Sequence, residues 1–402
     1  MLNTGKFICD KITGRKTSMF LPDIAANRDE LTRLVKGKKL LVIGGAGTIG
    51  SSFIRAILRF APSQLMVVDI NENGLTELTR DLRSIYGMRV PDDYRTYPLN
   101  FSDPIFEKIF RQNGGFDIVA NFSAHKHVRS EKDRWSVQAL LENNVLKARK
   151  LLELLTEFPP QHFFCVSTDK AANPVNIMGA SKRIMEDMIM SYSDKFKVTT
   201  ARCANVAFSN GSLLAGFVER IMKRQPLSAP NDVKRYFVSP EESGQICMLA
   251  CLLGKNREIF FPKLLVEQMM TFSSIADNFL LSLGYTPYRC ASEEDARKMA
   301  AELNDDDKNY PVYYFRSDTT GEKGYEEFFV PGEHLDLERF QALGVIDSVR
   351  ECSKMKLNQF LVDLKGLLDE PGTTKAEIVK IMEEYLPNFV HEEKGKNLDQ
   401  RM

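Results

Sequence analysis

The segment GGAGTIG, residues 44–50, constrains the fold more than any other stretch of the chain. It ends a short apolar run, KKLLVIGG (38–45), and opens a helical pattern, TIGSSFIRAILRF. Glycines between a strand and a helix allow a tight turn and a close approach of backbone to ligand, and the helix N-terminus then points at a pyrophosphate. A glycine trio alone is a weak indication. In this context it predicts a dinucleotide-binding turn rather than a tight turn with no ligand.

The predicted cofactor contacts of this turn are Gly44, Gly47, Thr48, Ile49 and Gly50. The next apolar run, QLMVVDI (64–70), places Asp69 at the end of a second strand, 22 residues after Gly47. A carboxylate in that place accepts hydrogen bonds from a ribose 2′-hydroxyl and repels a 2′-phosphate. The sequence therefore favours NAD over NADP as the cofactor.

Apolar strand runs alternate with helical patterns up to about residue 205, and the rhythm breaks after that. This order predicts an α/β protein with a Rossmann-type, doubly wound parallel sheet and a smaller C-terminal α/β substrate-binding domain. We expect four regions: an N-terminal extension (1–36), an NAD-binding Rossmann domain (37–205), a substrate-binding region (206–330) with some elements returning to the sheet, and a helical C-terminal extension (331–402).

Charge and cysteine content exclude several classes of function. The 54 basic residues balance 54 acidic ones, so nothing favours nucleic acid or an anionic membrane as a partner. The seven cysteines form no CxxC pair and no zinc spacing, and Cys247 and Cys251 read as small buried residues. Free thiols, no signal peptide and no apolar run of about 20 residues predict a cytoplasmic chain that does not enter a membrane.

The stretch FFCVSTDKAANPVNIMGASKR (163–183) begins as a strand, ends in a helix and carries the reactive side chains. Ligands of this fold class bind outside the C-terminal ends of the strands, so Thr168, Asp169 and Lys170 are expected at the mouth of the nucleotide cleft. Lys182 is expected to reach back from the helix to the nicotinamide ribose. Met178, four residues earlier, carries a thioether, which cannot exchange a proton at ordinary pH.

These motifs together resemble the extended short-chain dehydrogenase/reductase superfamily. Within it, the chain is similar to the polysaccharide-biosynthesis nucleotide-sugar 4,6-dehydratases that act on an N-acetylated hexosamine. The resemblance runs from about residue 20 to the C-terminus. It is carried by GGAGTIG, AHKHV (124–128), STDKAANPVNIMGASKR, RYFVSPEE (235–242) and TGEKGYEEF (320–328).

Two departures refine the resemblance. Met178 stands where most relatives have tyrosine, which is the pattern of the subgroup that retains configuration at carbon 5. That subgroup often has membrane segments ahead of the catalytic domain, and we expect none here. Thr319–Thr320 replaces an arginine–proline pair before the glycine–glutamate–lysine motif, so the nucleotide contact of that arginine is not predicted.

The resemblance implies three steps: hydride transfer from carbon 4 to NAD, loss of water across carbons 5 and 6, and hydride return to carbon 6. It implies Asp169 as the general acid and Lys170 as the base for the carbon 5 proton, with Thr168 as a hydrogen-bond relay. The group that takes the 4-hydroxyl proton is left open. Our hypothesis is that Asp169, or a water it holds, takes this proton, and that Met178 only packs beside the sugar.

The resemblance also implies the remaining site residues. Further cofactor contacts are Asn100, Phe101, Ser123, Ala124 and Lys182, and Asn144 is the active-site asparagine. Predicted substrate contacts are Lys126, Asn205, Arg235 and Glu322. Three alternatives accompany them: a metal held by the histidines that flank Lys126, which lacks further ligands at suitable spacing; a plain surface arginine at 235; and a helix-bending core asparagine at 144. No metal site is predicted.

The leading hypothesis is an NAD-dependent dehydratase of UDP-N-acetylglucosamine, or of GDP-N-acetylglucosamine, in bacterial glycan or nonulosonic acid biosynthesis. A nucleotide-sugar 4-epimerase would need the tyrosine and has no use for the Asp169–Lys170 pair. A non-catalytic NAD-binding regulator would bind NAD and leave the sugar nucleotide unchanged. The helices expected at about 134–157 and 178–194 form the dimer face in relatives, so a homodimer is the default expectation.

Overall fold

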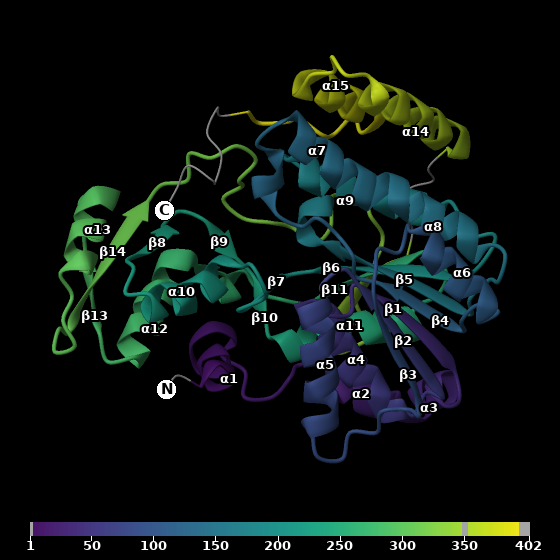
Figure 1. The fold of residues 1–402 in the computed structure, drawn as a ribbon, viewed down its shortest axis with the longest axis horizontal. Coiled ribbons are helices and arrows are strands. Elements are labelled where there is room, and N and C mark those ends of the chain that lie inside the picture. Colours follow the sequence, from purple (N-terminus) through teal and green to yellow (C-terminus); the bar gives the residue numbers. More distant parts are fainter. Residues whose placement is uncertain (1–2, 348–352, 394–402) are drawn as a thin grey trace.

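The computed structural model describes residues 3–347 and 353–393. Within them, the centre of the molecule is a nine-stranded sheet in the order β15-β16-β11-β6-β5-β4-β1-β2-β3 (Figure 1). Its strands are β1 (Lys39–Ile43), β2 (Gln64–Asp69), β3 (Asp93–Pro98), β4 (Ile118–Asn121), β5 (His162–Thr168), β6 (Val198–Cys203), β11 (Glu258–Pro262), β15 (Leu335–Asp336) and β16 (Leu343–Ile346). The strands from β3 to β11 pair in parallel, whereas β16 and β15 add antiparallel strands at one edge.

This strand order confirms the doubly wound fold. The chain proceeds from β1 through β2 to β3 on one side, then returns to β4 beside β1 and proceeds through β5 and β6 to β11. The order reverses between β1 and β4, and folds of this type bind ligands at that switch point, outside the carboxyl ends of the strands.

Helices cover both faces of the sheet, which is why its strands are nearly continuous apolar runs. The covering helices are α2 (Leu21–Ala26), α3 (Arg28–Val35), α4 (Thr48–Ile57), α5 (Glu72–Ser84), α6 (Pro104–Gln112), α7 (Arg134–Leu141), α8 (Lys147–Leu155), α9 (Ile177–Met190) and α11 (Pro240–Leu253). Helix α11 packs against α4, and α9 packs against α7, α8 and β5.

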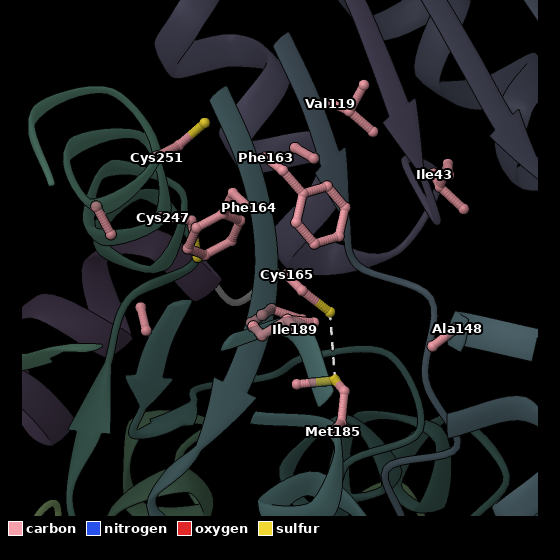
Figure 2. Packing of buried hydrophobic residues seen from close by; sticks show 14 of the residues in the cluster. Ile43, Val119, Ala148, Phe163, Phe164, Cys165, Met185, Ile189, Cys247 and Cys251 are labelled. Atoms are coloured by element: carbon pink, nitrogen blue, oxygen red, sulfur yellow. Dashed lines mark hydrogen bonds between the residues drawn. The ribbon is translucent and has the colours of Figure 1, made fainter. Parts of the chain in front are cut away.

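The packing between β5 and α9 stabilises the strand that ends in the predicted catalytic residues. Cys165 of β5 is buried, and its thiol donates to the Met185 sulfur of α9, with 3.2 Å between the two sulfurs (Figure 2). Burial raises the pKa of Cys165 and raises that of Cys251 to about 12. Cys247 and Cys251 are fully buried, which confirms their interpretation as small core residues.

A smaller lobe with its own apolar core follows the sixth strand (Figure 1). It contains α10 (Leu213–Met222), α12 (Phe272–Ser282), α13 (Glu293–Ala301) and a parallel sheet of β13 (Thr286–Arg289), β14 (Asn309–Phe315) and β8 (Leu227–Pro230). Two short pairs connect it to the main sheet: β7 (Asn205–Val206) with β10 (Phe237–Val238), and β9 (Lys234–Arg235) with β12 (Met270–Thr271). The N-terminal α1 (Thr4–Phe7) packs here, with Phe7 edge-on to Phe208 and Phe279.

The C-terminal region differs from the helical extension that we expected. Before its helices, β15 and β16 join the main sheet. The run LGVI in β16 is too short to show a period, and its pairing partner in β11 lies 81 residues or more earlier in the chain. Residues 348–352 and 394–402 of the expected extension lie outside the described residues.

The helices α14 (Lys354–Asp369) and α15 (Lys375–Tyr385) cover α7 and α9 (Figure 1). The Tyr385 hydroxyl donates to Asp187 of α9 at 3.2 Å, and Arg134 of α7 donates to the Leu368 carbonyl at 3.1 Å. The apolar side chains of both helices belong to the same core as those of α9. The surface of α9 that we expected to meet a second subunit is therefore covered within the chain itself.

Candidate active site

The glycine-rich turn connects β1 to α4 at the switch point. Gly44 has φ 73°, and a Cβ there would lie 2.6 Å from the Ser123 backbone nitrogen. A Cβ at Gly50 would lie 2.4 Å from the Gly44 carbonyl oxygen. Because neither position has room for a side chain, the fold itself requires these two glycines.

Gly47 differs, because the protein does not need a glycine there. Its φ of −71° and ψ of 163° suit any residue, and a Cβ would meet nothing nearer than the Gly44 carbonyl oxygen, at 3.4 Å. Gly47 is the N-cap of α4 and provides no side-chain cap. The missing side chain leaves the first N–H groups of α4, at Thr48 and Ile49, accessible to an anion. The turn thus fits the pyrophosphate of a dinucleotide.

The other predicted cofactor residues follow the ends of neighbouring strands. The Asp69 carboxylate ends β2 and accepts from the backbone N–H groups of Ala46 (3.0 Å) and Asn71 (2.9 Å), which holds it beside the glycine turn. Asn100 and Phe101 follow β3, and Ser123 and Ala124 follow β4. The structure therefore brings these residues to one edge of the sheet, although Phe101 is itself buried in the core.

Asn144 lies in a π-helical turn, Glu142–Leu146, between α7 and α8. Its amide oxygen accepts from the His125 backbone N–H at 2.8 Å, and its amide nitrogen donates to the His125 carbonyl (2.9 Å) and the Ser181 hydroxyl (3.1 Å). A single wide turn of this kind often marks a functional site. Asn144 connects the loop after β4 to α9, so the bent-helix interpretation and a place at the site are compatible.

The reactive residues form a compact cluster at the end of β5. Asp169 is 1% exposed, and its Oδ1 accepts from the Thr168 hydroxyl (2.9 Å), the Lys170 backbone N–H (2.9 Å) and the Lys170 ammonium (3.0 Å). Its Oδ2 is buried and has no hydrogen-bond partner among the described residues. A buried carboxylate oxygen without a partner is costly to the fold and is suited to receive a ligand hydroxyl.

Lys182 and Met178 lie on α9, the helix that follows this cluster in the chain. Lys182 is 3% exposed, its Nζ donates to the Val166 carbonyl at 2.8 Å, and burial lowers its pKa. Met178 is buried in the core, and its backbone N–H donates to Glu131 at 3.1 Å. The other oxygen of Glu131 lies 3.1 Å from the His391 Nε2. The sequence did not indicate Glu131 or His391, because no local pattern shows that residues 260 positions apart will meet.

Two predicted substrate residues join the cluster. The Asn205 side-chain oxygen lies 3.4 Å from the Lys170 Nζ. Arg235 is 4% exposed, which excludes a plain surface arginine, and its guanidinium donates to the backbone carbonyls of Lys234 and Lys323, both at 2.9 Å. The two remaining predicted substrate residues are not seen in contact with the cluster. Lys126 is exposed, and the Glu322 carboxylate accepts from the hydroxyls of Ser317 and Thr319.

Glu326 is a further member of the cluster that the sequence did not indicate. It is 3% exposed, and its Oε1 lies 3.9 Å from the Lys170 Nζ and 3.6 Å from the Arg235 guanidinium. Burial raises the pKa of Glu326. It belongs to the segment TGEKGYEEF (320–328), but two adjacent glutamates gave no indication of which one points inward.

A cavity of about 850 Å³ opens beside this cluster. Its wall includes Glu326, the aromatic residues Tyr236 and Phe328, and the stretch from Phe261 to Val266. A space of this size suits a drug-sized or cofactor-sized ligand. No group of three or more possible metal ligands occurs in the described part of the chain, so the histidines beside Lys126 are not part of such a group.

The fold and this edge of the sheet define the class: Rossmann-type α/β proteins with a dinucleotide turn and a second lobe over the carboxyl ends of the strands. The chain belongs to the polysaccharide biosynthesis protein family, whose profile matches residues 40–347. Across the described residues, no helix has the length and apolar character needed to cross a bilayer.

Relatives carry several names. An uncharacterized membrane protein of Methanocaldococcus jannaschii is 28% identical over 324 residues, or 79% of this chain and 88% of that protein. The probable polysaccharide biosynthesis protein EpsC of Bacillus subtilis is 27% identical over 70% of this chain, which spans 47% of EpsC. The UDP-N-acetylglucosamine 4,6-dehydratase (inverting) of Campylobacter jejuni is 23% identical over 58% of this chain and 68% of that enzyme. A UDP-glucose 4-epimerase of Rickettsia bellii is 27% identical over 56% and 66%.

Solved structures share the fold at low identity. Pen from Bacillus thuringiensis has a TM-score of 0.62 and 19% identity, covering 82% of this chain and 98% of that one. A dTDP-glucose 4,6-dehydratase from Streptomyces venezuelae, solved with NAD bound, has a TM-score of 0.55 and 20% identity, covering 72% and 88%.

Proposed function

We propose that this chain is an NAD-dependent nucleotide-sugar 4,6-dehydratase that acts on UDP-N-acetylglucosamine, with GDP-N-acetylglucosamine as the second candidate. The product would be the 4-keto-6-deoxy sugar nucleotide, used in glycan or nonulosonic acid biosynthesis. The observation that carries the proposal is the cluster of Thr168 and Lys170 around the buried Asp169 carboxylate. Family membership and the relative named as a 4,6-dehydratase support it.

NAD would lie on the glycine-rich turn, with Gly47 and the N-terminus of α4 at its pyrophosphate and Asp69 at its ribose. The chemistry that NAD supplies when bound is reversible acceptance of a hydride, which here would leave carbon 4 and return at carbon 6. Lys182 would hold the nicotinamide ribose. In the structure its Nζ donates to the Val166 carbonyl at 2.8 Å, which holds the end of the side chain against β5.

The Asp169–Lys170 contact explains how one pair can supply both an acid and a base. The Lys170 Nζ and the Asp169 Oδ1 lie 3.0 Å apart and form an ion pair. Movement of one proton from the Lys170 Nζ to Asp169 breaks one N–H bond and forms one O–H bond. The products are a neutral amine, which can take the carbon 5 proton, and a carboxylic acid, which can protonate the leaving 6-hydroxyl.

Met178 cannot take the proton of the 4-hydroxyl. Asp169 has by then taken the Lys170 proton, so a water held at its Oδ2, the buried oxygen that has no partner among the described residues, would accept the 4-hydroxyl proton and pass it to solvent. The Thr168 hydroxyl donates to Oδ1 and would keep the carboxylate oriented throughout.

A 4-epimerase is the second candidate, because some relatives are named UDP-glucose 4-epimerase. An epimerase needs a proton acceptor at the sugar 4-hydroxyl but no acid for a leaving group and no base for carbon 5. The buried acid–lysine pair is therefore unexplained in an epimerase and explained in a dehydratase. A regulator that binds NAD without chemistry leaves the same pair unexplained.

The test is incubation of the purified protein with UDP- and GDP-N-acetylglucosamine, separately, in deuterated water, followed by proton NMR and mass spectrometry. We expect loss of one water, a new 6-methyl resonance and deuterium at carbon 5 with one of the two sugars. Conversion to the 4-epimer without loss of water would identify an epimerase. Unchanged spectra for both sugars with NAD retained would favour the regulator.

A further inference from the structure

Glu326 is a buried carboxylate that the proposed chemistry does not use, and it lies between two cations. Its Oε1 is 3.9 Å from the ammonium of Lys170 and 3.6 Å from the guanidinium of Arg235. The charged groups that act on it are Lys170, Asp169, Arg235 and Lys323. Glu326 also forms part of the wall of the 850 Å³ cavity.

We propose that Glu326 is a positioning residue that takes up a proton from solvent when a sugar nucleotide binds, and thereby frees Lys170 to act as a base. This inference rests on the proposed function; to it we add that Arg235, one of the predicted substrate contacts, holds the diphosphate of the sugar nucleotide, because a guanidinium can bind phosphate oxygens through two N–H groups. In this step one proton is transferred from the solvent to the Glu326 carboxylate, where it forms one O–H bond.

The reason is electrostatic. In the free protein, the Glu326 carboxylate lies 3.9 Å from the Lys170 Nζ and stabilises the ammonium form of that lysine. A diphosphate at Arg235 brings negative charge to the same small, buried space and competes for the same guanidinium. A like charge at close range raises the pKa of a carboxyl group, in addition to the effect of burial. Once protonated, Glu326 no longer stabilises the ammonium, and the Lys170 proton can move to Asp169.

Binding calorimetry tests this without turnover. The probes are the β-methyl esters of UDP and of GDP, because a diphosphate diester has no proton that titrates near neutral pH. Titration in buffers of different ionisation enthalpy reports the number of protons taken up per ligand bound. We expect uptake of about one proton by the wild-type holoenzyme, and an affinity that falls as pH rises.

Glu326→Gln removes the titrating group with little change of shape. We expect no proton uptake, a flat pH dependence and binding at least several-fold tighter above neutral pH, because the buried negative charge is gone. A merely structural role would weaken binding instead. Glu326→Asp keeps the carboxylate and should keep the proton uptake. Glu327→Gln is the matched control: Glu327 is the next residue, pairs with Lys323 at 3.3 Å and should behave as wild type.

The outcomes separate the two proposals. Proton uptake that survives in Glu326→Gln, or that disappears in Asp169→Asn while Glu326 is intact, overturns the inference about Glu326 and leaves the dehydratase proposal standing. If neither probe binds the wild-type holoenzyme, the nucleotide-sugar function itself fails, and the role of Glu326 fails with it.

Discussion

The glycine-rich turn and the acid–lysine cluster lie at the same edge of one sheet, but they are built in opposite ways. The turn comes from seven consecutive residues and works through backbone groups and missing side chains. The cluster brings together side chains from the end of β5 and the turn after it, from β7 and β9, and from the segment 320–328. The turn should therefore be sensitive to added atoms, and the cluster to removed charges.

The largest effect is expected from removing the carboxylate of the cluster. Asp169→Asn keeps the shape of the side chain but can neither take the Lys170 proton nor deliver one to the leaving 6-hydroxyl. We expect kcat to fall about 10²–10⁴-fold, the usual contribution of a general acid or base, with bound NAD retained. Turnover is measured by the appearance of the 6-methyl resonance. A loss of less than about tenfold would remove Asp169 from its assigned role.

The next effect is expected from adding one methyl group to the turn. Gly47→Ala has room within the protein, so the fold should stay intact while NAD affinity falls by about tenfold or more, on the order of 1.4 kcal/mol. Gly50→Ala is the contrasting variant, because its Cβ would collide with the Gly44 carbonyl oxygen, and the protein itself should be destabilised. Thermal unfolding and NAD titration distinguish the two. Equal behaviour of both variants would contradict our explanation of Gly47.

A smaller effect on turnover is expected at Met178, because its side chain carries no charge. Met178→Phe preserves an apolar side chain of similar volume in a buried position, so turnover should stay within about tenfold of wild type. A loss as large as that of Asp169→Asn would assign Met178 a direct part in the chemistry.

The smallest effect on catalysis is expected at the opposite end of β5. His162 is buried there, and burial lowers its pKa to about 4. The unfolded chain takes up this proton below its ordinary pKa of about 6.5, but the folded chain does not until about pH 4, so stability falls as pH falls through this window.

His162→Gln should reduce that loss by up to about 1.4 kcal/mol per pH unit and leave turnover at pH 7 unchanged. Urea unfolding of both proteins at pH 7 and pH 5 measures the difference. An identical pH dependence of the two unfolding free energies would show that folding does not lower the pKa of His162.

The two regions also differ in how far the sequence predicts them. The strand, glycine turn and helix at residues 38–57 are local, so their pattern predicted both structure and place. Thr168, Asp169 and Lys170 were predicted together because they are consecutive. Glu326 was not, because its position depends on a segment that crosses from the small lobe, and only burial distinguishes it from Glu327. The roles of all these residues remain predictions.

Tertiary pairing accounts for the other differences. Strand β16 forms against β11, and nothing in four residues of its sequence indicates that partner. The helices α14 and α15 were expected as a helical extension, but their amphipathic pattern does not say which surface they cover. Their position over α9 and α7 is a property of the folded chain, and it leaves no exposed apolar face on α9 for the dimer that the resemblance implied.

The π-helical turn at Glu142–Leu146 interrupts what would otherwise be one regular helix running from α7 into α8. One extra residue in that turn sets the angular offset between α7 and α8. Deleting any one of these five residues would restore a regular helix only by rotating everything beyond it through about 100° about the helix axis. The buried leucines of α8 would then face away from the core, and a deletion ahead of Asn144 would also turn its amide away from the His125 carbonyl and the Ser181 hydroxyl. Length at this one place is therefore as much a specified property of the chain as the identity of any side chain.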